Sequence, residues 1–147
     1  MVGPTTIHFV CTGNIYRSRL AEAYCTSLNA AGIRAFSSGI AAGRWDDAAI
    51  SPHAAEVLAR HSLSSYAAAG WQRTTADLVR SSDVLVFMED EHHRFCANWI
   101  ELGRQRVEIW GVKDIDGLEA AEIPDEVERT FEIIRRHTDA LIARLSE

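Results

Sequence analysis

The sequence has 147 residues, 47% of them hydrophobic and 24% charged, and a formal net charge of −6. These values are typical of a globular protein, so we expect a single domain over residues 1–147, and the acidic balance argues against a nucleic-acid or anionic-membrane partner. No run approaches the roughly 18 apolar residues of a membrane span, the N-terminus lacks the features of a signal peptide, and the three cysteines show no disulfide spacing. Together these features favour a reducing cytoplasm.

The first expected strand and helix enclose a short loop. Residues 6–10 are rich in β-formers and end directly at Cys11. Ser18 opens a stretch with apolar residues at helical spacing, which Gly32 should stop. Residues 33–37 are then expected as a second short strand, followed by a glycine-rich turn. The loop therefore joins the end of a strand to the start of a helix.

The rest of the chain continues the alternation of strands and helices. Ser51 and Pro52 predict a helix start, and the apolar run 83–88 predicts a parallel strand covered on both faces. The other expected elements are a short helix at 74–80, a helix at 89–100, a strand at 106–110, an acidic loop at 111–124 and a last helix from Asp125. This order predicts an α/β fold with a doubly wound parallel sheet of about four strands flanked by helices. Ligands of such sheets bind beyond the carboxyl ends of the strands, where Cys11 is expected.

Residues 11–18 read Cys-Thr-Gly-Asn-Ile-Tyr-Arg-Ser and carry the strongest functional signal. Backbone N–H groups of a loop that wraps over a helix start converge and can bind an anion. Arg17 adds a planar guanidinium that can bind two phosphate oxygens at once. Gly13 and Asn14 tolerate unusual backbone conformations, and Asn14 can also bond across the loop. The Ser18 hydroxyl is within reach of the cysteine sulfur and could stabilise it as a leaving group.

The same surroundings act on the sulfur of Cys11. A thiol that titrates at about 8.5 in a free peptide can titrate at about 3.5–7.5 beside a helix N-terminus and a cation. We therefore expect a thiolate beneath a bound phosphate, and nucleophilic catalysis on a phosphate ester. A buried structural cysteine at a strand end is the alternative. The strand, the Cys-x5-Arg-Ser spacing and the helix together favour the functional interpretation.

With these residues the sequence resembles the low-molecular-weight protein tyrosine phosphatases, whose hallmark Cys-x-Gly-Asn-x-Cys-Arg-Ser follows the first strand. The likeness covers residues 10–24, 36–39, 83–92 and 107–144. It implies a compact parallel sheet, a phosphocysteine intermediate, and neither a metal nor a cofactor. It also implies that Cys11 is the nucleophile, that Arg17 is the phosphate clamp, and that phosphate binding and loop support fall to Thr12, Gly13, Asn14, Ile15, Tyr16, Ser18 and Ser37.

The family also takes a general acid from a distant loop, an aspartate usually followed by proline and an aromatic residue. The best match here is Asp125, after Pro124, which we expect to protonate the leaving oxygen and then to deprotonate water. Asp125 could instead serve only as the cap of the last helix, and Asp114 and Asp116 are the alternative acids. The match is imperfect, because Glu126 stands where the family has proline.

Other departures from the family concern the loop and its rim. Tyr16 stands where the family has a second loop cysteine, so no protective disulfide can form there, and Arg19 stands where a proline is often found. Tyr16 and Trp45 could line the mouth of the pocket and stack on an aromatic substrate. His92 and Cys96 lie four residues apart on an expected helix, but two ligands without a partner motif are better explained structurally than as a zinc site.

The sequence thus favours a phosphatase acting on phosphotyrosine in proteins or on a small aryl phosphate, as a monomer or weak dimer. The physical reason is depth, because a thiol at the floor of a loop is reached more easily by a long aryl phosphate than by a short alkyl one. Arsenate reduction is an alternative that would need relay cysteines, for which only Cys25 and Cys96 are available. A phosphate-binding regulatory module without turnover is the third possibility.

Overall fold

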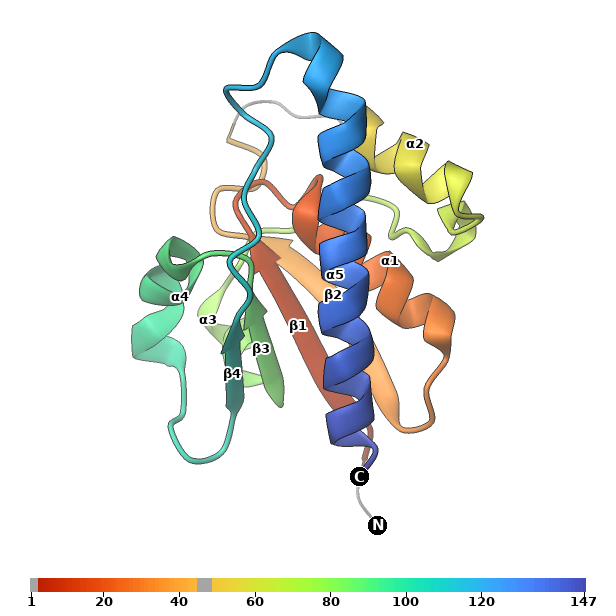
Figure 1. Cartoon of the computed structure of the whole chain (residues 1–147). Coiled ribbons are helices and arrows are strands. Elements are labelled where there is room, and N and C mark those ends of the chain that lie inside the picture. Colours follow the sequence, from red (N-terminus) through yellow and green to blue (C-terminus); the bar gives the residue numbers. More distant parts are fainter. Residues whose placement is uncertain (1–2, 45–48) are drawn as a thin grey trace.

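The computed structural model, which describes residues 3–44 and 49–147, has a sheet of four parallel strands at its centre (Figure 1). The spatial order is β2-β1-β3-β4. The strands are β1 (Thr5–Cys11), β2 (Ile33–Gly39), β3 (Val84–Phe87) and β4 (Arg106–Ile109). The α/β fold and the four-stranded parallel sheet expected from the sequence are therefore confirmed.

Helices cover both faces of this sheet. They are α1 (Arg17–Leu28), α2 (Pro52–Arg60), α3 (Ala76–Arg80), α4 (Asp90–Cys96) and α5 (Ile123–Leu145), with short 3₁₀ turns η1 (Ser64–Tyr66), η2 (Ala97–Trp99) and η3 (Ala120–Glu122). In Figure 1, α1 and the long α5 lie side by side over one face, with α2 beside them, while α3 and α4 lie toward the β3 and β4 side. Among the described residues, no helix combines the length and the apolar character that crossing a membrane requires.

The two faces follow from the alternation of side chains along the strands. Ile7 and Phe9 of β1 are fully buried in the core formed with α1, α2 and α5. Val10 of β1 joins Leu85 and Phe87 of β3 in a second core beneath α3 and α4. A central parallel strand is thus buried on both sides, which explains the continuous apolar runs in the sequence.

The helix boundaries predicted from capping residues and glycines can be compared with the observed ones. The Ser51 hydroxyl caps α2 as expected, accepting from the backbone N–H of His53 at 3.2 Å. The first helix ends at Leu28 rather than near Gly32, because Asn29 adopts the left-handed conformation with φ 48°. At the other end of the chain, α5 begins at Ile123, two residues before the expected Asp125.

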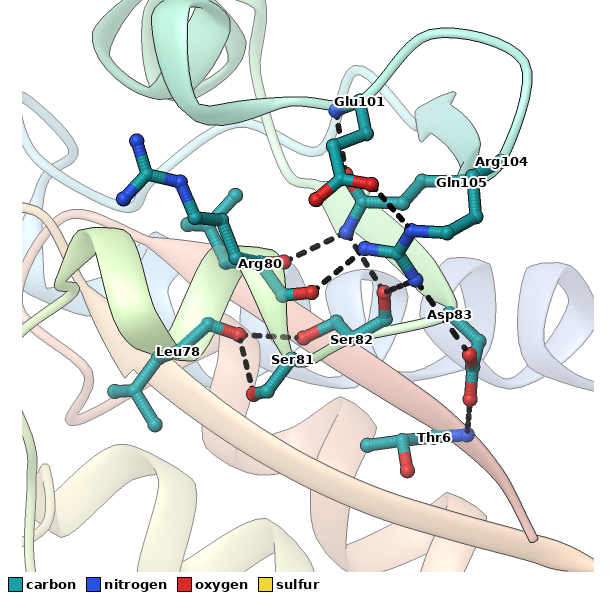
Figure 2. A network of polar contacts seen from close by, with 10 residues as sticks. Thr6, Leu78, Arg80, Ser81, Ser82, Asp83, Glu101, Arg104 and Gln105 are labelled. Atoms are coloured by element: carbon teal, nitrogen blue, oxygen red, sulfur yellow. Dashed lines mark hydrogen bonds and ion pairs between the residues drawn. The ribbon is translucent and has the colours of Figure 1, made fainter. Parts of the chain in front are cut away.

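A polar network joins the amino-terminal ends of the strands, which lie opposite the carboxyl ends that carry the loop (Figure 2). The Gln105 side-chain amide donates to the carbonyls of Val79 and Ser82, both at 2.7 Å. One oxygen of Asp83 accepts from the backbone N–H of Thr6 at 2.8 Å. These contacts tie the starts of β1, β3 and β4 together, and so hold the opposite edge of the sheet in register.

Candidate active site

A cavity of about 690 Å³ opens at the carboxyl ends of the strands, next to the end of β1. It is lined by Cys11, Thr12, Gly13, Ile15, Tyr16, Arg17, Ser51, Glu89, Glu91, Lys113, Asp114, Ile115 and Asp116. Most of the loop identified from the sequence therefore faces one cavity. Trp45, the other expected rim residue, lies outside the described residues. Tyr16 does line the cavity, but only 5% of it is exposed, because most of the ring packs into the core.

The side-chain amide of Asn14 determines the direction of the hydrogen bonds beneath the loop. The Asn14 side-chain N–H group donates to the hydroxyls of Ser18 and Ser37, each at 2.8 Å. Its carbonyl oxygen accepts from the backbone N–H of Gln72 at 2.8 Å, which fixes the orientation of the amide. Since both hydroxyl oxygens accept from Asn14, their hydrogens are free to point elsewhere. The Ser18 hydroxyl lies 2.9 Å from Cys11 Sγ, where it can donate to a thiolate.

The second hydroxyl of this network ends on a carboxylate. Ser37 donates to Glu22 Oε1 at 2.5 Å, and burial raises the pKa of Glu22. Sequence reasoning did not single out Glu22, although its place four residues after Ser18 on α1 puts the two side chains on one helix face. The chain of contacts thus runs from the sulfur through Asn14 to a half-buried acid beneath the loop.

The backbone of the loop is suited to an anion. Within residues 3–44 and 49–147, the backbone N–H groups of residues 12–16 donate to no other residue. Asn14 has φ 55°, the left-handed conformation that its short polar side chain tolerates. Successive free N–H groups at the start of α1 form the kind of concave nest that binds a phosphate.

Arg17 is held in place by several groups before any ligand arrives. Only 2% of it is exposed, and it donates to Glu89 Oε1 at 2.5 Å and to the Val112 carbonyl at 2.8 Å. Its second terminal nitrogen lies 3.5 Å from Asp114 Oδ2. Burial alone would lower the pKa of Arg17, but its electrostatic interactions with Cys11, Asp114 and Glu89 raise it on balance. The guanidinium is therefore charged and fixed at the cavity wall.

The structure separates the three candidate acids. Asp114 and Asp116 line the cavity, on the segment that connects β4 to α5. Asp125 is placed in the first turn of α5 and is not among the lining residues. Asp114 and Asp116 thus line the cavity and Asp125 does not, and a general acid has to reach the leaving oxygen there.

Arg19 shows what replaces the proline that often follows Arg-Ser in this motif. It is 1% exposed and donates to the carbonyls of Asn14 at 3.3 Å, Ala49 at 2.7 Å and Ala68. The side chain thus joins the loop to two later segments of the chain. These partners could not be predicted from the sequence, because every residue type has the same backbone carbonyl.

Among the residues that the structure describes, one group of possible metal ligands is formed by Glu89, Glu91 and His92 beside the cavity, with ligand atoms within 4.8 Å of one another. His92 Nδ1 accepts from the backbone N–H of Glu89 at 3.0 Å, and its Nε2 contacts Thr12 Oγ1 at 2.9 Å. Both ring nitrogens are thus engaged, so the cluster offers two carboxylates without a free imidazole lone pair. We interpret His92 as a structural link between α4 and the loop.

The whole arrangement, a cysteine in a nest of amides with a fixed arginine six residues later, agrees with a comparison of the sequence with known families. Residues 6–147 match the family described as low molecular weight phosphotyrosine protein phosphatase. The chain belongs to this family. The resemblance found in the sequence is confirmed, and the coarse activity that it implies is that of a phosphatase.

Individual relatives of this phosphatase differ in their named activities. A protein-arginine-phosphatase of Bacillus subtilis is 27% identical over 139 residues, which cover 92% of this chain and 88% of that protein. The tyrosine phosphatase AmsI of Erwinia amylovora shares the fold with a TM-score of 0.80 and 22% identity, covering 98% of this chain and 95% of that one. A thioredoxin-dependent arsenate reductase of Corynebacterium glutamicum has a TM-score of 0.70 and 21% identity, and the match covers 99% of this chain and 64% of that one. The fold alone therefore does not decide the substrate.

Proposed function

We propose that this phosphatase works through a phosphocysteine on Cys11. The observation that carries the proposal is the orientation of Ser18, whose oxygen accepts from Asn14 and whose hydrogen is thereby free for the sulfur 2.9 Å away. The Cys11 thiolate attacks phosphorus, and the bond from phosphorus to the leaving oxygen breaks. Loop amides and Arg17 bind the other phosphate oxygens as charge develops on them.

We propose Asp114 as the general acid of this step. Its carboxyl lines the cavity, and its Oδ2 lies 3.5 Å from the Arg17 guanidinium that would hold the phosphate. Asp114 gives its proton to the leaving oxygen and then, as the carboxylate, takes a proton from water. That water attacks phosphorus, which releases inorganic phosphate and returns the thiolate, with the Ser18 hydroxyl stabilising the departing sulfur.

For the substrate we propose phosphotyrosine in proteins. Ile15, Tyr16 and Ile115 give the cavity apolar walls, and the buried Cys11 lines the same cavity, which suits a flat aryl group bearing the phosphate. The three cysteines are free, which is in keeping with a cytoplasmic location.

A second candidate substrate is phosphoarginine, and a specific observation favours it. Four carboxylates, those of Glu89, Glu91, Asp114 and Asp116, line the cavity against the charges of Arg17 and Lys113. A phosphorylated guanidinium keeps a positive charge that such carboxylates would attract. The named activity of the Bacillus subtilis relative points the same way.

Arsenate reduction is less well supported, because the other thiols are poorly placed for a relay. Cys25 and Cys96 belong to two different cores, on α1 and α4 respectively. Burial raises the pKa of Cys25 to about 11 and that of Cys96 to about 12, so neither is a ready nucleophile.

The deciding experiment compares wild type with Cys11→Ser on para-nitrophenyl phosphate, a phosphotyrosine peptide and a phosphoarginine peptide. Cys11→Ser should lose turnover on all of them while it still binds inorganic phosphate, because the amide nest and Arg17 remain. Cys25→Ser, the same change at a thiol outside the cavity, should leave turnover intact. Full activity of Cys11→Ser would refute the phosphocysteine, binding without wild-type turnover would favour the regulatory module, and the better peptide would decide the substrate.

A further inference from the structure

A hydrogen bond from the backbone N–H of Glu89 determines which ring nitrogen of His92, the third residue of α4, carries the proton. The ring is 0% exposed, and its Nδ1 accepts from the backbone N–H of Glu89 at 3.0 Å, so Nδ1 carries a lone pair. Burial, helped by the charge of Arg17, lowers the pKa of His92 to about 3, which keeps the ring neutral. The single ring proton must then sit on Nε2. From there it is donated to Thr12 Oγ1, 2.9 Å away, because the other acceptor near Nε2, Glu91 Oε1, is 3.7 Å away and beyond hydrogen-bond distance.

Thr12 Oγ1 has a second donor beside it. Arg17 Nη2 lies 3.3 Å from the same oxygen. A hydroxyl has two lone pairs and one hydrogen, and within the described chain both hydrogen bonds of this oxygen are ones that it accepts. Its hydrogen is the one group left over. Because Thr12 follows Cys11 and lines the cavity, that hydrogen is what the side chain presents to a ligand there.

We infer that the Thr12 hydroxyl donates a hydrogen bond to the bound phosphate, and that His92 is the positioning residue that orients it. This inference rests on the proposed phosphatase function and adds a side-chain donor to the loop amides. His92 prevents the alternative orientation, in which the hydroxyl would donate toward α4 and offer the phosphate a lone pair. A lone pair of Thr12 Oγ1 that faces an anionic phosphate oxygen would repel it. The tautomer of His92 therefore decides whether the contact between the Thr12 hydroxyl and the phosphate is attractive or repulsive.

The first test removes the hydroxyl with little change of shape. Thr12→Val should weaken the binding of inorganic phosphate and of vanadate about 10- to 100-fold, which is what a hydrogen bond to a charged group is worth. Thr12→Ser keeps the hydroxyl and should bind close to wild type. Both affinities are measured by calorimetry, so they do not depend on turnover, and thermal unfolding shows whether each variant is folded. Equal affinities of wild type and Thr12→Val would overturn the inference.

The second test asks whether His92 acts through Thr12. His92→Leu should weaken phosphate binding in the wild-type background and add little in the Thr12→Val background, because the hydroxyl that it orients is gone. A loss of the same size in both backgrounds would mean a merely structural histidine and would overturn the positioning role. His92→Gln enters the same cycle if the leucine variant does not fold. A wild type that binds phosphate but hydrolyses no ester would instead refute the proposed function alone.

Discussion

At the scale of single residues, the site depends on where each proton can go. Asn14 donates to the hydroxyl oxygens of Ser18 and Ser37, which leaves both hydroxyl hydrogens free to be donated. The Ser18 hydroxyl can then donate to the sulfur of Cys11, and Ser37 donates to the carboxylate of Glu22. The leaving oxygen also needs a proton, and its donor has to reach the cavity. Asp114, the donor that we propose, lines the cavity from an irregular segment at 41% side-chain exposure, which suits a group that must meet substrate, phosphate and water in turn.

The assignment of the acid can be tested at this scale by leaving-group dependence. Asp114→Asn should lower kcat by about 10²- to 10⁴-fold for a phenol that leaves poorly, since general acid catalysis supplies factors of this size. The loss should be much smaller for para-nitrophenyl phosphate, whose leaving oxygen needs less help. Asp125→Asn is the matched control and should stay near wild type. If the control shows the leaving-group effect instead, or if Asp116→Asn does, the acid is that residue.

At the scale of elements, the loop keeps its shape because β2 approaches it closely. Gly39, the last residue of β2, pairs with Cys11 across the sheet. A Cβ atom at Gly39 would lie 2.5 Å from the Thr12 carbonyl oxygen and 2.6 Å from the Asn14 nitrogen. Real Cβ atoms do not come so near to backbone, so only glycine lets the strand support the loop from below.

Gly39→Ala should therefore displace the loop. We expect a loss of about 1–3 kcal/mol in the free energy of unfolding, as for other overpacked sites, together with a clear loss of phosphate affinity. Gly70→Ala is the matched control, because a Cβ there meets nothing within 4 Å and the residue has no positive φ. Urea unfolding and phosphate calorimetry measure both quantities. Similar behaviour of the two variants would contradict the close approach.

At the scale of the whole molecule, two buried histidines make stability depend on pH. His8 and His92 are both 0% exposed, and burial lowers the pKa of each to about 3. In the unfolded chain a histidine binds a proton below about 6.5, whereas in the folded protein these two do not. The unfolded state then holds more protons, so stability falls as the pH drops below about 6.5.

Each of these histidines should remove about 2 kcal/mol from the free energy of unfolding between pH 7 and pH 5. The half-buried Glu22, whose pKa is raised, works in the opposite direction and reduces the total. Urea unfolding at several pH values measures the slope. His8→Gln and His92→Gln should each flatten the curve by one histidine's share, and curves parallel to wild type would show that the buried rings do not titrate in this way.

The sequence by itself determined the parts of this protein whose physics is local. Residues 11–18 were recognised as a candidate site because a cysteine, a loop at a helix start and an arginine lie within one strand-to-helix turn. The alternation of strands and helices predicted the parallel sheet. The Ser51 cap was visible for the same reason, since its donors lie two and three residues away.

Only the tertiary structure decided which distant groups meet that loop. Glu89 and His92 come from a segment more than 70 residues after the loop, and no spacing in the chain announces such a contact. The proposal of Asp114 as the acid, rather than Asp116 or Asp125, also rests on the path of the segment between β4 and α5, whose irregular backbone has no sequence periodicity from which to predict it. Interactions between neighbouring residues can be predicted from the sequence. The residues that contact a buried charge from distant segments depend on how the helices and strands pack.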